Sequence, residues 1–195
     1  MHKRKVDYLT KVGMLGAIAV ILMFLDMPLP MMPVFLKLDI SELPAVIGAF
    51  ALGPGAAVWI EFIKNSLHAL NTQTAGIGEF ANFLVGISFT VPMGYLYKKR
   101  PDFAGAALSL MTGTLAMVLA ATVLNYFVLL PLYQKVLHFP LDKLVAMGTA
   151  ANPHIVDIKT FIVLAIAPFN LIKGMVVTVV TLLIYKKVLP LLRLN

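Results

Sequence analysis

The 195-residue chain contains no cysteine, and this absence excludes disulfide frameworks, thiolate metal sites and cysteine nucleophiles together. Charge is also scarce: Asp, Glu, Lys and Arg make up 13% of the residues, where soluble proteins have about 25%. Long apolar runs take their place, since hydrophobic residues reach 60% and the mean hydropathy is +0.91. A chain of this composition is expected in a lipid bilayer rather than in water.

Familiar catalytic and nucleotide-binding motifs are missing as well. The sequence has no HExxH pair, no GxSxG turn, no DxD set and no GxxxxGKS/T phosphate loop. An intramembrane enzyme would have to use Glu61, His68, Glu79 and His154, which are not spaced as paired metal ligands. We therefore expect no catalytic residue, no metal ion and no resident cofactor, and an enzyme is the weaker alternative.

The formal net charge of +7 raises the question of nucleic acid. The basic residues, however, cluster beside apolar runs, as they do in the cytoplasmic loops of membrane proteins. We therefore expect a lipid bilayer, and no nucleic acid, around this chain.

Apolar runs bounded by proline, glycine or charge predict an all-α integral membrane protein with six transmembrane helices. These helices are expected at about residues 10–25, 41–52, 56–70, 78–97, 104–132 and 157–188. Residues 1–195 then form a single transmembrane domain that binds a substrate. With six crossings, ten Lys and Arg residues fall on the side of the two termini and four on the opposite side. Because such an excess marks the cytoplasmic side, we expect both termini in the cytoplasm.

Polar side chains interrupt the apolar segments, and each needs a reason because an ionisable group in a bilayer costs about 2.5–3.5 kcal/mol. In one helix they follow the spacing of a single face, from Glu61 to His68. Asn170 and Lys173 lie about midway along the last helix, and Lys173 would close a pocket that is open to the outside for a small polar solute. The outer polar residues of this predicted pocket are Asn65, His68, Glu79, Asn82 and Asn125.

Ordinary structural roles remain open for several of these residues. Glu61 can pair with Lys64 or Asn65 within its own helix. Glu79 suits the positive end of a helix dipole. Lys173 differs because no acidic residue lies within one turn of it, so a bound acceptor or a partner on another helix has to compensate its charge.

The loop at residues 35–44, FLKLDISELP, allows two interpretations. Asp39 or Ser41 can cap the second helix, whose early Pro44 is tolerated in a first turn. The alternation of polar and apolar residues also suits an extended lid. Such a lid would present apolar groups and hydrogen-bonding groups to one ligand.

Five stretches of the sequence carry a resemblance to a known family: FLKLDISELPAVIGAF at 35–50, Gly53-Pro54, EFIKNSLH at 61–68, GIGEFANFLVG at 76–86 and PFNLIK at 168–173. They resemble the riboflavin-specific substrate-binding components, or S-components, of energy-coupling-factor (ECF) vitamin transporters. The resemblance is close over the first half of the chain and resumes in the last helix.

The resemblance implies a six-helix S-component in a bacterial plasma membrane, which captures riboflavin from outside under the loop between helices one and two. Leu38 and Ile40 would help to supply flat apolar walls for the flavin ring. The riboflavin-binding residues expected from the polar pattern and the resemblance together are Leu38, Asp39, Ile40, Ser41, Pro44, Asn65, Glu79, Asn82, Asn125, Asn170 and Lys173.

The resemblance also implies partners. Gly13 and Ala17 stand where small residues of the first helix dock onto a transmembrane T subunit, and two ATP-binding-cassette ATPases complete the importer. ATP hydrolysis there would topple the S-component within the membrane and expose its pocket to the cytoplasm. The alternatives are an S-component for another vitamin or nucleobase-like solute, a stand-alone permease and, least favoured, an intramembrane enzyme.

Overall fold

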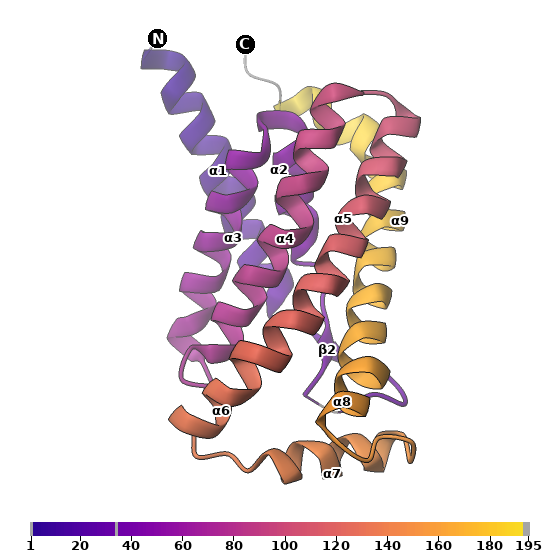
Figure 1. The fold of residues 1–195 in the computed structure, drawn as a ribbon. Coiled ribbons are helices and arrows are strands. Elements are labelled where there is room, and N and C mark those ends of the chain that lie inside the picture. Colours follow the sequence, from indigo (N-terminus) through magenta and orange to yellow (C-terminus); the bar gives the residue numbers. More distant parts are fainter. Residues whose placement is uncertain (1, 34, 193–195) are drawn as a thin grey trace.

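The computed structural model describes residues 2–33 and 35–192, and its long helices stand side by side in one bundle (Figure 1). The start of α1 and the end of α9 lie at the same end of that bundle. The bounds of the bundle helices are α1 His2–Met23, α2 Glu42–Leu52, α3 Pro54–His68, α4 Ile77–Lys99, α5 Phe103–Leu124 and α9 Ala167–Leu192.

Helix α2 lies at the centre of the bundle, because it packs against α1, α3, α4 and α9. Its side chains from Pro44 to Phe50 are buried without interruption. Around them lies the larger apolar core, with Ile60 of α3 and Phe89 of α4 fully buried. At the end of α2, Gly53 adopts a φ of 99°, which favours glycine, and turns the chain directly into α3.

Two of the long helices contain a π-helical turn. Helix α5 continues through the π turn η2, Asn125–Leu129, into α6, Leu130–Val136. Helix α8, Ile158–Phe161, continues through the π turn η3, Ile162–Ile166, into α9. Such turns add one residue to a helical turn and are frequent at functional sites.

The end of the bundle away from the termini carries the elaborate connections (Figure 1). Short helix α7, Leu141–Ala151, lies across this end. Strands β1, Met27–Pro28, and β2, Lys37–Leu38, pair antiparallel in the loop after α1, so only part of the predicted lid is extended. The 3-10 turn η1, Ala69–Asn71, ends α3.

Helix α8 begins with a capping box at this same end. The Asp157 carboxylate accepts a hydrogen bond from the backbone N–H of Thr160 at 2.7 Å, and the Thr160 hydroxyl accepts one from the backbone N–H of Asp157. The hydrogen bond from the Thr160 backbone lowers the pKa of Asp157.

Helix α1 begins at His2 rather than near residue 10, where the apolar run starts. Its first turns carry charged residues that form helices readily. Asp7 and Lys11 form an ion pair of 2.7 Å one turn apart, which supports this extension.

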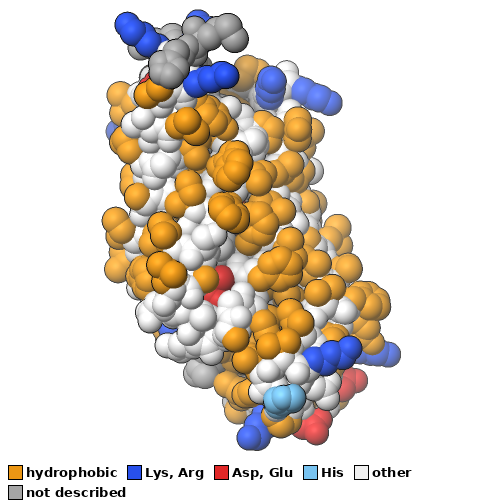
Figure 2. Space-filling model, turned by 90° about the vertical axis from the view of Figure 1, so that its left-hand side faces the viewer, with side chains coloured by type: hydrophobic (Ala, Val, Ile, Leu, Met, Phe, Trp, Pro, Cys, Tyr) orange, Lys and Arg blue, Asp and Glu red, His pale blue; other side chains and the backbone are white. Residues whose placement is uncertain are grey.

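Apolar side chains cover the middle of the face shown in Figure 2, and Lys and Arg gather at its two ends. Among the described residues, four helical stretches are long and apolar enough to cross a membrane: Lys3–Met23, Ile77–Lys99, Phe103–Val136 and Ile158–Leu192. Helix α3, with 15 residues, is shorter than these stretches, and its two charged side chains, Glu61 and Lys64, are turned into the protein. The α-helical membrane architecture predicted from composition therefore agrees with the structure.

Helix α2 is too short to cross a bilayer alone. Its 11 residues span about 16 Å, whereas the hydrocarbon layer is about 30 Å thick. Its first turn meets Lys173, which lies near the middle of the continuous helix Ile158–Leu192. The non-helical segment 39–41 therefore reaches that depth inside the protein, the only setting in which irregular backbone is tolerated within a membrane.

Candidate ligand-binding site

A cavity of about 450 Å³ lies in the half of the bundle that carries α6, α7 and α8. Its volume falls within the range of about 300–1,000 Å³ that is usual for small-molecule pockets. The exposed side chains of Phe35, Lys37 and Gln73 line it from the loops at that end. Its polar lining deeper in the bundle consists of Glu42, Asn82, Asn125, Asn170 and Lys173.

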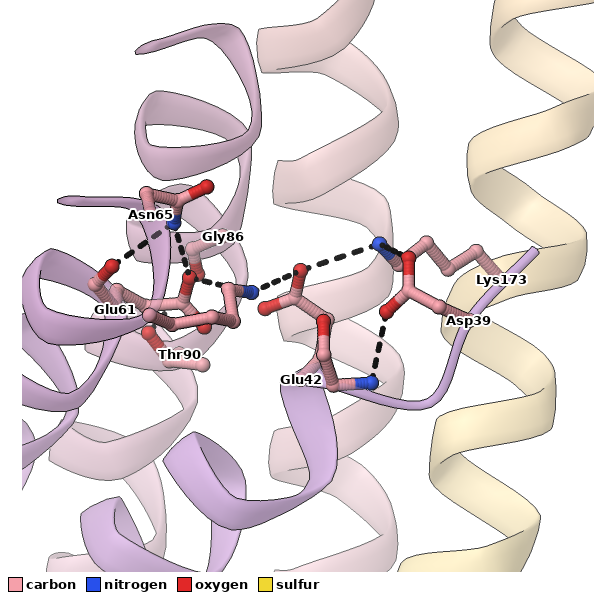
Figure 3. Close-up of polar contacts among 9 residues, drawn as sticks. Asp39, Glu42, Glu61, Asn65, Gly86, Thr90 and Lys173 are labelled. Atoms are coloured by element: carbon pink, nitrogen blue, oxygen red, sulfur yellow. Dashed lines mark hydrogen bonds and ion pairs between the residues drawn. The ribbon is translucent and has the colours of Figure 1, made fainter. Parts of the chain in front are cut away.

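The floor of the cavity is built around Lys173. Its ammonium donates a hydrogen bond to the Asp39 carboxylate at 3.0 Å and lies 3.3 Å from a Glu42 oxygen (Figure 3). All three side chains are at least 90% buried. The partner that the Lys173 charge requires is thus supplied by the loop before α2 and by the first turn of α2.

This ion pair is one end of a buried ionic chain formed by Asp39, Lys173, Glu42, Lys64 and Glu61. The second lysine of the chain, Lys64, lies 3.0 Å from Glu42 and 2.8 Å from Glu61. Asn65 completes it by donating to the Glu61 carboxylate at 3.2 Å. Each oppositely charged partner offsets part of the cost of taking the others out of water.

Two asparagines hold their amides in one orientation at the π turns. The Asn125 side-chain amide donates to the Ala121 carbonyl and the Asn170 amide donates to the Ile166 carbonyl, each at 2.8 Å. With the nitrogen assigned in this way, each side-chain oxygen stays available as an acceptor. The side-chain oxygen of Asn82 is buried without a hydrogen-bond partner. The polar part of the cavity therefore offers three amide acceptors and the Lys173 ammonium.

Much of the remaining cavity lining is apolar and aromatic. The rings of Phe35 and Phe161 stack with their centroids 6.1 Å apart. Flat aromatic faces of this kind suit a planar ligand. The other aromatic side chains that line the cavity are Tyr133, Phe139 and Phe169.

Sequence reasoning did not identify these aromatic residues. Phe35 and Leu36 line the cavity, whereas Leu38 and Ile40 were expected to supply its flat walls and do not line it in this structure. Phe169 could have been found, because it precedes Asn170 in the stretch PFNLIK. Tyr133 carried no comparable signal, since the path of the loop after it could not be foreseen.

Of the eleven predicted binding residues, Asn82, Asn125, Asn170 and Lys173 line the cavity. The structure places the others, which do not line it, close behind its floor or near its mouth. These residues are Leu38, Asp39, Ile40, Ser41, Pro44, Asn65 and Glu79.

The residues before α2 fix the shape of the floor. The Ser41 backbone N–H donates to Asp39 at 2.8 Å, which holds the carboxylate toward Lys173. Ser41 is the residue before α2, but its side chain makes no capping hydrogen bond. Pro44 is buried in the first turn of α2, where a missing backbone N–H does no harm.

Glu79 binds neighbouring groups rather than the cavity. Its carboxylate accepts hydrogen bonds from Thr72 at 2.8 Å and from Thr74 at 3.3 Å, and it lies 3.0 Å from His68. The hydrogen bonds from Thr72 and Thr74 tie the loop that carries Gln73, at the cavity mouth, to the start of α4. Asn65 belongs to the buried ionic chain.

The predicted docking residues lie on the outside of α1. Gly13 and Ala17 are exposed, and a side chain added at Gly13 would meet no atom within 4 Å. Gly16, by contrast, packs against Ile63 of α3. Among residues 2–33 and 35–192, no group of three or more His, Cys, Asp or Glu side chains is placed to hold a metal ion.

Comparison with known proteins gives one consistent result. Residues 7–185 match the family described as ECF transporter, substrate-specific component. The riboflavin transporter FmnP of Bacillus subtilis (strain 168) is 41% identical, over 95% of this chain and 94% of that protein. The riboflavin transporter RibU of Staphylococcus aureus (strain TCH60) is 35% identical, over 92% of this chain and 88% of that protein.

A solved structure shares the fold. It is described as the S component of a bacterial ECF transporter, and it superimposes with a TM-score of 0.77 at 34% identity, covering 96% of this chain and 98% of that chain. The resemblance drawn from the sequence is therefore confirmed. The chain belongs to the family of substrate-specific components of ECF transporters.

Proposed function

We propose that this chain is the riboflavin-binding subunit of an ECF importer. The observation that carries the proposal is the cavity itself, whose lining combines aromatic side chains with three amide acceptors and an ammonium. Two relatives named as riboflavin transporters, 41% and 35% identical over most of their length, support the same ligand. As a member of a transporter family with such relatives, the chain is not an enzyme.

Riboflavin has a flat three-ring system with carbonyl groups and one imide N–H, and a chain of hydroxyl groups. In our proposal the Lys173 ammonium donates to a ring carbonyl, and Asn125 and Asn170 accept from the imide and from hydroxyl groups. The ring lies against Phe35 and Phe161. Residues 38–44 contact the ligand when the loop closes over it, and Asn65 and Glu79 support the surrounding helices.

We further propose six membrane crossings with both termini in the cytoplasm. The start of α1, the end of α9 and the connection between α4 and α5 share one end of the bundle, as the contact of Lys186 with the Phe103 ring at 5.1 Å illustrates. Most Lys and Arg residues lie at that end, and such an excess marks the cytoplasmic side. Arg193, one of the ten counted there, lies outside the described residues. Helix α2 with segment 39–41 counts as the second crossing, and the cavity then opens outside.

The proposed partners are a T subunit and two ATP-binding-cassette ATPases. The T subunit docks on the exposed face of α1 that contains Gly13 and Ala17, where small side chains let two helices approach closely. ATP hydrolysis in the complex then topples this chain and turns the cavity toward the cytoplasm.

Purification in mild detergent tests the ligand directly. We expect visible absorption bands of bound flavin, and quenching of riboflavin fluorescence when riboflavin is titrated into flavin-free protein. Asn125→Leu removes one acceptor and should weaken binding by about 5- to 150-fold, the effect of about 1–3 kcal/mol for a lost buried hydrogen bond. Thr112→Val, on the exposed face of the same helix, serves as the matched control.

Each rival predicts a different outcome of the same experiments. An S-component for another vitamin or a nucleobase-like solute would show neither flavin bands nor quenching, and a panel of such solutes would shift its melting temperature instead. A stand-alone permease would accumulate riboflavin in vesicles without further subunits. Our proposal requires the coupling subunits and ATP for uptake.

A further inference from the structure

Glu42 and Glu61, at the α2–α3 end of the buried ionic chain, bring two carboxyl groups together over Gly86 of α4 (Figure 3). A Cβ atom added at Gly86 would lie 2.6 Å from one Glu61 oxygen and 3.0 Å from one Glu42 oxygen. One oxygen of each carboxyl group therefore lies against the same glycine of α4. Both side chains are at least 98% buried.

Each of these carboxyl groups has one oxygen with partners and one without. Oε1 of Glu42 contacts both Lys64 and Lys173, and Oε2 of Glu61 contacts Lys64 and Asn65. Oε2 of Glu42 and Oε1 of Glu61 are buried with no hydrogen-bond partner. Two buried acceptors without a donor are unfavourable, and neither group can supply a donor to the other while both are ionised.

The charges of the buried ionic chain do not balance if every group is ionised. Its three carboxylates carry three negative charges against the two positive charges of Lys64 and Lys173, which leaves one negative charge. The neighbouring groups from α4, Gly86 and Thr90, are uncharged. A buried charge without compensation is strongly unfavourable in a membrane.

We propose that Glu42 and Glu61 bind one proton between them, with the neutral carboxyl of Glu61 donating a hydrogen bond to the carboxylate of Glu42. One proton supplies the missing hydrogen bond and removes the excess charge. It turns one unpartnered acceptor into a donor for the other, and it makes the buried ionic chain neutral overall. The carboxylate of Glu42 then stays paired with Lys64 and Lys173, and Lys173 stays paired with Asp39 as well.

The bound proton makes Glu61 a positioning residue for the floor of the cavity. Glu61 acts through Glu42, whose other oxygen lies 3.3 Å from the Lys173 ammonium. Loss of the proton would make the Glu42 and Glu61 carboxylates repel each other. It would also attract Lys64 and Lys173 toward the added negative charge. This effect on the ligand depends on the proposed function, whereas the proton itself does not.

Infrared spectroscopy of the ligand-free protein in detergent tests for the proton without riboflavin. We expect the carbonyl stretch of a protonated carboxyl group at neutral pH, shifted by exchange into D₂O. The band should vanish in Glu61→Gln and persist in Glu79→Gln, the matched control, whose carboxylate is fully supplied with donors. Absence of the band in the wild-type protein at neutral pH overturns the proposal, and that measurement needs no variant to fold.

Variants extend the test to the positioning role. Glu61→Gln keeps the shape and can donate its amide N–H to Glu42, so its riboflavin affinity should stay within about threefold of wild type. Glu61→Ala should lower the melting temperature, because Glu42 loses that donor. A loss of folding in Glu61→Gln equal to that in Glu61→Ala, or a melting temperature that depends on added Na⁺, would mean that the site holds something other than a proton.

Discussion

At the scale of single residues, the Lys173 ammonium links the ligand cavity to the buried ionic chain. The residue is buried, and two carboxylates from a distant part of the chain neutralise it. Removal of Lys173 would leave those buried carboxylates without their cation, and breaking a buried ion pair from one side lowers the free energy of unfolding strongly. One side chain therefore belongs both to the buried ionic chain and to the lining of the cavity.

We predict that Lys173→Met destabilises the protein by about 3–5 kcal/mol, the usual effect of breaking a buried ion pair from one side. Melting in detergent should show this directly. The double variant Asp39→Asn/Lys173→Met removes one of the stranded charges and should recover part of the loss. If the double variant melts no higher than the single one, the interaction of the two side chains is not what stabilises the floor.

The need of Lys173 for a partner was predictable, but the partner was not. Nothing acidic lies within one turn of it in the sequence, which correctly indicated a partner elsewhere. Asp39 lies 134 positions away, and only the packing of α2 against α9 brings the two together. Periodicity shows which face of a helix is polar, but it does not show which other helix or loop packs against that face.

At the scale of secondary-structure elements, Gly86 determines how closely α4 approaches the paired carboxyls. In an exposed helix, replacement of glycine by alanine adds up to about 1 kcal/mol of stability. Here the new methyl group would meet oxygens that Lys64 and Asn65 hold in place, and overpacking costs about 1–3 kcal/mol. The steric effect is therefore expected to exceed the helix propensity.

The expected outcome is that Gly86→Ala lowers the melting temperature while Gly13→Ala leaves it unchanged or raises it. Gly13 is the matched control because an added Cβ atom there meets nothing within 4 Å. Thermal unfolding of both variants in the same detergent makes the comparison. Equal shifts in the two variants would show that α4 can move away from the carboxyl pair without penalty.

The sequence predicted where helices occur better than how they are wound. The extents of α2 and α4 follow the apolar runs closely, because proline, glycine and charge bound those runs. The π turns η2 and η3 left no such mark. Each rotates the residues beyond it by about 100° relative to a regular helix. The faces presented by Leu129 and Ile166 therefore could not be derived from spacing alone.

At the scale of the whole molecule, the absence of cysteine makes the orientation testable one position at a time. A single cysteine at Lys3 or at Lys143 is the only thiol in its variant. In intact cells, a membrane-impermeant maleimide should label Lys143→Cys and should label Lys3→Cys only after the cells are broken. The reverse pattern would place the cavity mouth in the cytoplasm.

The proposed docking to a T subunit is also tested on the whole molecule. A bulky residue on the exposed face of α1, as in Ala17→Trp, should abolish riboflavin uptake by the assembled transporter and leave riboflavin binding by the isolated chain intact. Uptake assays in cells, beside fluorescence titration of the purified variant, separate the two activities. Leu9→Trp, also exposed on α1, shows whether any large side chain on this helix has the same effect.

The depth of α2 also affects the route by which a solute can enter or leave the cavity. Toward the loops, the cavity is lined by side chains of the segments around Phe35, Lys37 and Gln73. Toward the other end, a bound solute would have to part Lys173 from Asp39 and Glu42 in surroundings where water cannot take over their charges. The loops at the far end of the bundle are thus the favourable route into and out of the cavity. In the proposed function, a solute that enters at the loop end leaves at that same end, so its delivery to the opposite side of the membrane would require the whole chain to turn.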